Sequence, residues 1–506
     1  MKPAKMCVAA IALATLAVSV ATAARRPDAT AGKTQRHQIH RNDATFTSDG
    51  RAVESLGPGS MRTVSGHRIG HYKDGAVPVD LSTRVVAAYV PNTVSYNEIV
   101  GTGTSTGTFT IPGVPSGFYL LRLGRQFLWT SNTTVNADYY ASYRSTAVPP
   151  VNYTTLTFNL ANLNPWQDTD LFEMAGPSTG SFDLFPGVTG ETTFTGTFQY
   201  TDILNDSTQG DKTYFIQLVT QPVGGYVFNS AGRFFAPKNF VQVDGSNAPV
   251  NGTFKTVDQN QTFRANINGA DLAAQTLAAN PGAVLVDTSL FLDVYPGSLA
   301  KGETTSTPDL MGYSFYTGRN PITVNVDLGD VSYGNPFPKN WPLFVGYQYF
   351  AQTPYLAPGA TNGTAISTNV FGNTTTLPSQ TSPIQLLVGT VIGPTVGGGN
   401  FFANLSGIGL MPTLSWAPPS VGTANTYAVF VYQLSNNGGN SQVSQVARLQ
   451  TPRTSITLPP GLLSPGQAYV FRVRTLYLPG VKVQTMPYVT GPVNGLADVI
   501  SGIMQP

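Results

Sequence analysis

Hydrophobic and polar residues alternate at several places along the chain, and a period of two is typical of a strand with one buried face. Phe109 and Ile111 fall on one face of such a run, between threonines that fall on the other. A second alternating run covers 322–328. Further strands are predicted at 84–90, 118–123, 192–198 and 213–219. We therefore expect an all-β fold of tandem antiparallel β-sandwich domains.

Two stretches depart from this pattern. Residues 269–279 are rich in Ala and Leu, carry Asp271 in the first turn and precede Asn280-Pro281-Gly282, which predicts one short helix. Residues 352–382 are rich in Thr, Pro, Gly and Asn and are interpreted as a loop or linker. A chain of 506 residues is long enough for about three or four domains. We expect 161–405 to hold one or two further β-rich domains.

The chain begins like an exported bacterial protein. Lys2 and Lys5 precede an apolar run at 6–21, and Ala21-Thr22-Ala23 is a small-residue cleavage site. We expect residues 1–23 to be a signal peptide cleaved after Ala23, with an uncleaved anchor as the alternative. No later apolar run is long enough to cross a bilayer. The expected location is extracellular, cell-surface or periplasmic, with no integral membrane span after cleavage.

Residues 24–75 are polar and lack a sustained apolar period, so we expect a flexible or partly ordered N-terminal arm. The single cysteine, Cys7, lies inside the expected leader. A mature chain without cysteine forms no disulfide and no thiolate metal site. Its stability must come from buried cores, which its length permits.

The strands at 107–123 are separated by turn residues in a specific order. Pro112-Gly113 is expected to break the first strand, and a turn containing Gly117 follows, because Gly113 and Gly117 can adopt backbone conformations closed to other residues. This series resembles the carboxypeptidase regulatory-like (transthyretin-like) sandwich, a carbohydrate-binding-like fold, over residues 76–160. The resemblance implies a spacer or binding module, and no residue that would carry sugar binding over is matched.

The C-terminal region carries a second set of ordered motifs. Trp416 follows Pro412-Thr413-Leu414-Ser415, and the run Leu463-Ser464-Pro465-Gly466 leads to Tyr469. These motifs resemble a fibronectin type III module over 410–490, followed by a tail at 491–506. The resemblance implies that Trp416 lies in the core. It also implies that the hydroxyl of Tyr469 bonds to backbone upstream and fixes the crossing between sheets.

Charge is scarce, at 11% of residues with a formal net charge of +2. Nucleic-acid binding normally requires a clustered basic face, so we expect no nucleic-acid partner. The threonines, asparagines and glycines that replace charged residues suit turns and the solvent faces of strands. This composition supports the prediction of a loop-rich β protein outside the cell.

Histidine chemistry is confined to the start of the chain, where all four histidines lie: His37, His40, His67 and His71. A Ser-His-Asp hydrolase would need the arm to fold back onto a sandwich. His67 and His71 are four apart, as zinc ligands on a helix can be, but Gly66 and Gly70 disfavour a helix. We expect solvated histidines, no bound metal and no cofactor.

The remaining candidates for ligand contact are acids and aromatic residues. Trp166 lies beside Asp168 and Asp170, a composition common at sugar sites; the alternative is an Asp-capped turn covered by the tryptophan. Trp341, Tyr347 and Tyr349 are candidates for an aromatic platform, with core packing as the default interpretation. Asp327 and Asp330 suit calcium or, more simply, a turn.

These observations favour a non-catalytic exported or cell-surface protein that acts as a scaffold or binds an extracellular protein or glycan. The alternative is a carbohydrate-active protein, either a glycan-binding module or a glycosidase that uses carboxylates alone. The two differ in a structural expectation. A glycosidase needs two carboxylates about 5–10 Å apart, whereas a binder needs exposed aromatic or polar groups without such a pair.

Overall fold

The fold is all-β, and one α-helix interrupts the strands in the described part of the chain. The computed structural model describes residues 60–93, 95–141, 143–147, 151–176, 181–184, 188–200, 203–294, 308–314, 320–487 and 493–506. The expected signal peptide and residues 24–59 of the expected arm lie outside them. No helix in the described ranges has the length and apolar character to cross a membrane.

The N-terminal strands begin inside the range predicted as an arm, so residues 61–72 of that range are ordered as strands. They form two small sheets and one edge of a much larger sheet. The strands are β1 (Met61–His67), β2 (Ile69–Tyr72), β3 (Gly75–Pro78), β4 (Val86–Pro91), β5 (Tyr96–Val100), β6 (Thr102–Gly103), β7 (Thr108–Pro115), β8 (Tyr119–Leu123), β9 (Gln126–Thr130), β10 (Thr134–Asn136) and β11 (Tyr139–Tyr140).

Pro112-Gly113 does not end strand β7 as predicted. The strand continues through it, and its register against β1 shifts between Arg62 and Val64, which leaves a β-bulge at this point. Gly113 has a φ of 73°, which glycine tolerates best. Gly117, with a φ of 117°, occupies the second predicted turn. The bulge returns Val114 to the core, where it is fully buried.

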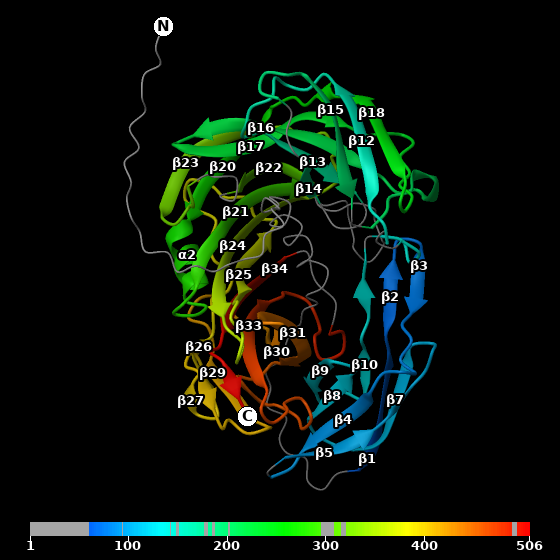
Figure 1. Ribbon diagram of the computed structural model, residues 1–506, viewed down its shortest axis with the longest axis vertical. Helices are drawn as coiled ribbons and strands as arrows, with labels where there is room; N and C mark the ends of the chain where they lie inside the picture. Colours follow the sequence, from blue (N-terminus) through cyan, green and yellow to red (C-terminus); the bar gives the residue numbers. More distant parts are fainter. Residues whose placement is uncertain are drawn as a thin grey trace.

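A two-sheet sandwich follows at one end of the molecule (Figure 1). Its outer sheet has the order β15-β12-β18, and its aromatic core lies between this sheet and β13–β17. The elements are β12 (Thr154–Ala161), β13 (Leu171–Ala175), β14 (Ser181–Leu184), β15 (Thr193–Tyr200), the 3-10 helix η1 (Ser207–Gln209), β16 (Tyr214–Val223), β17 (Tyr226–Phe235), β18 (Asn247–Thr253) and β19 (Lys255–Thr256).

The next part contains the predicted helix and a strand that was not predicted from the sequence. Helix α2 (Gly269–Leu277) confirms the prediction. Strand β25 (Thr364–Thr374) occupies the stretch interpreted as a linker, and it pairs along both edges. The other elements are β20 (Gln261–Asn268), β21 (Val284–Val294), β22 (Asp309–Ser314), β23 (Asn325–Tyr333) and β24 (Leu343–Tyr355).

The C-terminal part buries the two residues expected to be structural. Trp416 lies in the core, and the hydroxyl of Tyr469 accepts a 2.9 Å hydrogen bond from the backbone N–H of Ser464, five residues upstream. The elements are β26 (Ile392–Val396), β27 (Gly399–Asn400), β28 (Leu405–Ser406), β29 (Thr413–Ala417), β30 (Thr426–Asn437), β31 (Asn440–Thr451), β32 (Ser455–Thr457), β33 (Ala468–Tyr477), β34 (Asn494–Ile500) and β35 (Met504–Gln505).

The segment 491–506 is not a simple tail. Every residue of β34 is buried, and this strand pairs with β25 on one edge and with β33 on the other. It therefore joins the middle of the chain to the C-terminal part. Strand β35 adds a further pairing to β33 and β28.

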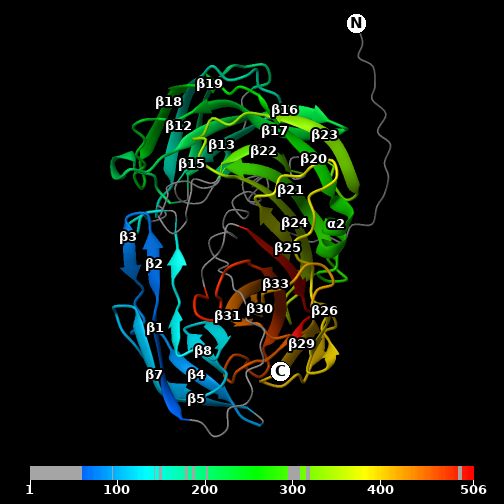
Figure 2. The same cartoon turned by 180° about the vertical axis from the view of Figure 1, so that it is seen from behind.

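Strand pairing also joins the two ends of the described chain. β9 runs parallel to β31, with Phe127 opposite Leu449, so one sheet of 19 described strands includes N-terminal, middle and C-terminal strands. Trp129 and Phe127 share a core with Trp416 and Tyr427. Figures 1 and 2 show the result: the chain returns on itself, with β4, β5 and β8 near β30 and β33 at the end opposite the β15-β12-β18 sheet, while β2 and β3 extend toward that sheet.

A buried ion pair lies where the middle and C-terminal parts meet. Arg474 on β33 donates from Nε and Nη2 to the two carboxylate oxygens of Asp498 on β34, at 2.7 and 2.9 Å. The backbone N–H of Asn369 on β25 donates to the same carboxylate at 3.1 Å. Both charged side chains are at most 1% exposed, and Phe430 packs against the guanidinium. A buried pair this well hydrogen-bonded holds three strands in register.

Removing the carboxylate of Asp498 should therefore be costly. We expect Asp498→Ala to lower the free energy of unfolding by about 3–5 kcal/mol, because Arg474 would stay buried without its counter-ion. Asp327→Ala is the matched control, since Asp327 forms an exposed pair with Arg264 and such pairs contribute little. Chemical denaturation of both variants tests this, and equal midpoints for the two would contradict it.

Candidate functional site

The predicted sugar site at Trp166 is a structural turn. Trp166 is buried in the sandwich core and is not exposed to solvent. Asp170 is buried and accepts hydrogen bonds from the N–H and hydroxyl of Thr220, both at 2.8 Å, and from Gln217 at 3.0 Å. Asp168 is exposed and accepts from the hydroxyl of Thr189. The alternative interpretation, an Asp-capped turn covered by the tryptophan, matches these contacts.

The predicted aromatic platform is also a core feature. Tyr347 and Tyr349 are buried, and burial raises the pKa of both hydroxyls. Tyr347 accepts from the N–H of Leu387 at 2.7 Å, and Tyr349 donates to the carbonyl of Ile322 at 2.7 Å. Trp341 is partly buried and stacks on Phe337. Tyr347 and Tyr349 are therefore not available to stack on a sugar.

The acids considered for calcium have a cationic partner. Arg264 donates to Asp327 at 2.6 Å and to Asp330 at 3.3 Å. The hydrogen bond from Arg264 lowers the pKa of the Asp327 carboxyl. Throughout the ranges that the structure describes, no three His, Cys, Asp or Glu side chains are placed to hold one metal ion.

Two histidines share a carboxylate that sequence reasoning missed. The Nε2 atoms of His67 and His71 each lie 3.2 Å from Oδ2 of Asp138, while Oδ1 accepts from the N–H of Ile69 at 2.9 Å. Tyr140 stacks on the ring of His71. These histidines are half-buried and partnered, contrary to the expectation of solvated side chains. They lie 71 and 67 residues from Asp138, so no local motif could have revealed the contact.

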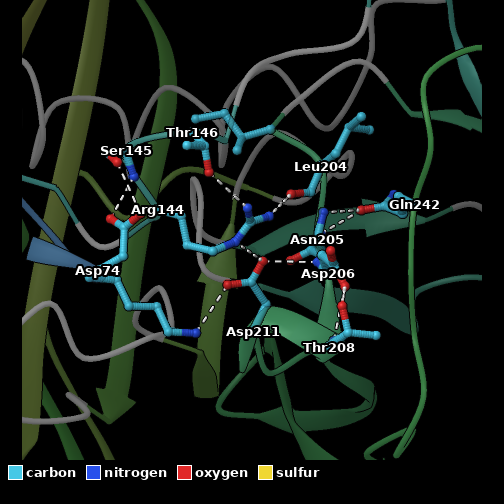
Figure 3. A network of polar contacts seen from close by, with 12 residues as sticks. Asp74, Arg144, Ser145, Thr146, Leu204, Asn205, Asp206, Thr208, Asp211 and Gln242 are labelled. Carbon is cyan, nitrogen blue, oxygen red and sulfur yellow. Dashed lines mark hydrogen bonds and ion pairs between the residues drawn. The ribbon is translucent and has the colours of Figure 1, made fainter.

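The densest polar network described lies where the N-terminal strands meet the sandwich (Figure 3). Its centre is Asp211, whose carboxylate side chain is 1% exposed. Lys73, which follows β2, donates to Oδ1 at 3.0 Å, and Arg144 donates to Oδ2 at 3.0 Å. We call these three residues the clasp, because they tie the hairpin β2–β3 and the segment at 143–147 to the loop that carries η1.

Backbone and amide contacts hold the clasp rigid on the sandwich side. The N–H of Asp206 donates to Asp211 at 2.9 Å, and Asp206 itself caps η1 by accepting from the N–H of Thr208. Asn205 donates from its side chain to Gln242 at 2.6 Å (Figure 3). On the other side, Asp74 accepts from the N–H and hydroxyl of Ser145. These contacts hold the N-terminal segments and the loop that carries η1 in a fixed relative position.

Among the residues that the structure describes, one sheet face of the sandwich is open to solvent. It is the outer face of β15-β12-β18, where the residues of the central strand that point outward are Thr155, Thr157, Asn159 and Ala161. Tyr153, directly before this strand, is 51% exposed. This face and the clasp are the two features that could serve binding and positioning.

Comparisons with known proteins add no identity to this chain. No protein family matches the sequence, and no curated protein is similar to it. The resemblances to carboxypeptidase regulatory-like and fibronectin type III modules therefore stand as predictions from the residues quoted for them.

The buried carboxylate at the centre of the clasp should matter for stability. We expect Asp211→Asn to lower the free energy of unfolding by about 3 kcal/mol, because Lys73 and Arg144 are each only 12% exposed and would lose their counter-ion. Amide exchange should rise in β2 and near η1. Asp74→Asn at the exposed edge of the network should have little effect. The idea fails if exchange rises only in distant strands.

Proposed function

We propose that this chain is an exported, non-catalytic protein whose β-sandwich modules form one scaffold that presents a binding surface. The observation that carries the proposal is the pairing of strands across modules, β9 with β31 and β25 with β34. Modules joined through shared sheet edges and cores keep fixed positions, whereas modules on linkers move independently. A fixed arrangement suits a protein that holds or displays a ligand.

Four buried or partly buried carboxylates support the same proposal. Asp170, Asp211 and Asp498 are each bound by several donors, and Asp138 is shared by two histidines. Carboxylates fixed in this way serve structure. A catalytic acid instead needs an environment that raises its pKa next to an open site.

The proposal is tested by offering the purified mature protein a panel of soluble polysaccharides and measuring both retention and the release of reducing ends. We expect retention without release. Sustained release of reducing ends that is lost on substituting one carboxylate would overturn the proposal in favour of the glycosidase. Asp168→Ala is the first variant to examine, because Asp168 is the exposed acid of the predicted pair.

Export is tested separately from binding. Expressed in a bacterium with its own leader, the protein should appear outside the cytoplasm with Ala24 as its first residue. Replacing Ala21 and Ala23 with leucine should retain the precursor, because the cleavage site requires small side chains at these positions. N-terminal sequencing gives the result, and a cytoplasmic protein that keeps Met1 would contradict export.

A further inference from the structure

The outer face of the β15-β12-β18 sheet is a regular array of uncharged side chains, ten of the twelve polar and two, Ala161 and Pro249, apolar. Strand register places its outward-facing residues in four rows. The rows are Gln199–Thr155–Asn247, Thr197–Thr157–Pro249, Thr195–Asn159–Asn251 and Thr193–Ala161–Thr253. None of the twelve is charged, and all positions on the two flanking strands are exposed. Rows in a sheet lie about 6.6 Å apart along the strand, and neighbours within a row about 4.8 Å apart.

An exposed aromatic residue stands at one end of this array. Tyr153 directly precedes β12, is 51% exposed, and is two residues before Thr155, so an extension of the strand alternation places it on the side of the array. Asn152 is held by a 2.7 Å hydrogen bond from its N–H to Asp244, and Thr154 donates to the carbonyl of Val243 at 3.0 Å. These bonds fix the backbone on both sides of Tyr153. The exposed ring of Tyr153 is therefore carried by a held segment at the end of the polar array.

The chemistry of the face excludes several classes of partner. Nucleic acid and anionic lipid require basic side chains, and the face has none. Stable protein interfaces centre on buried aromatic, Met or Arg residues, whereas the centre of this face is Thr157 and Asn159. Hydroxyl and amide groups both donate and accept hydrogen bonds, as sugar hydroxyls do. An uncharged array therefore matches a neutral carbohydrate.

We propose that this face binds a neutral polysaccharide chain laid along β12, with Tyr153 stacking on one sugar ring. The proposal rests on the proposed function, a non-catalytic binder, and names its ligand class and its site. Thr155, Thr157 and Asn159 supply the hydrogen bonds along the central strand. Asn247 already accepts from the hydroxyl of Thr157 at 2.7 Å, which orients both groups and leaves the amide N–H groups of Asn247 as donors.

The test is affinity electrophoresis of the mature protein in gels that contain one soluble polymer each. The neutral probes are a β-glucan, a xylan, a galactomannan and a dextran, and polygalacturonate is the charged probe. We expect retardation by at least one neutral polymer and not by polygalacturonate. Retardation should persist at high salt, because screening acts on charges and this face has none.

Variants locate the binding. Tyr153→Ala should weaken retention at least about tenfold, equivalent to about 1.4 kcal/mol, and Thr157→Lys should abolish it by placing a charged side chain across the array. Thr110→Lys is the matched control: Thr110 is an exposed threonine on β7, also on a sheet face, but outside the sandwich. Thermal unfolding checks that every variant is folded, since all of these side chains lie at the surface.

Each outcome has one meaning. A wild-type protein that no neutral polymer retards overturns the inference, as does retardation unchanged in both Tyr153→Ala and Thr157→Lys. Retardation accompanied by release of reducing ends would instead overturn the non-catalytic proposal while leaving the site in place. The two failures are therefore distinguishable in one set of gels and assays.

Discussion

The fold depends on satisfying backbone hydrogen bonds at the edges of its sheets. An exposed edge strand presents unpaired N–H and C=O groups that favour association with other chains. Here β9 pairs with β31, and β34 lies between β25 and β33, so edges of strands far apart in the sequence satisfy one another. The buried pair of Arg474 and Asp498 fits only where three such strands meet in register. Sheet continuity and the ion pair therefore reinforce the same arrangement.

That constraint explains which elements could be predicted from the sequence. Strands with one buried face, such as the run through Phe109 and Ile111, follow the period of two, and the helix that begins at Gly269 is marked by its stop residues. Strand β25 was missed because it contains Thr, Asn and Gly and is buried through pairing on both edges. Its Asn369 meets Asp498 from 129 residues away, a partnership that composition cannot show. Strand β34 was missed for the same reason: pairing on both edges buries it at the end of the chain.

The candidate sites show the same limit. Neighbouring acids suggested ligand contact at Trp166, and a cluster of aromatic residues suggested it at Tyr347, but a large ring buried in a core has the same local sequence as one on a surface. His67 and His71 were expected to be solvated. The parallel pairing of β2 with β11 instead brings Asp138 beside them, which the sequence does not show. The outer face of β12 could in principle be predicted from the sequence. Its alternation of threonine with leucine and phenylalanine predicts one polar face, and what the sequence lacked was the identity of the two flanking strands.

Scarce charge connects these features. Some of the few charged residues form internal ion pairs. Arg474 pairs with Asp498 between strands, and Lys73 and Arg144 pair with Asp211 at the clasp. Buried charges require partners, so each of these contacts fixes two or three segments. The outer face of β15-β12-β18 is left to uncharged side chains, most of them hydroxyls and amides that form directional hydrogen bonds. On the proposed binding face, which carries no charged side chain, recognition would depend on the spacing of hydroxyl groups on the ligand, and long-range electrostatic attraction would play little part.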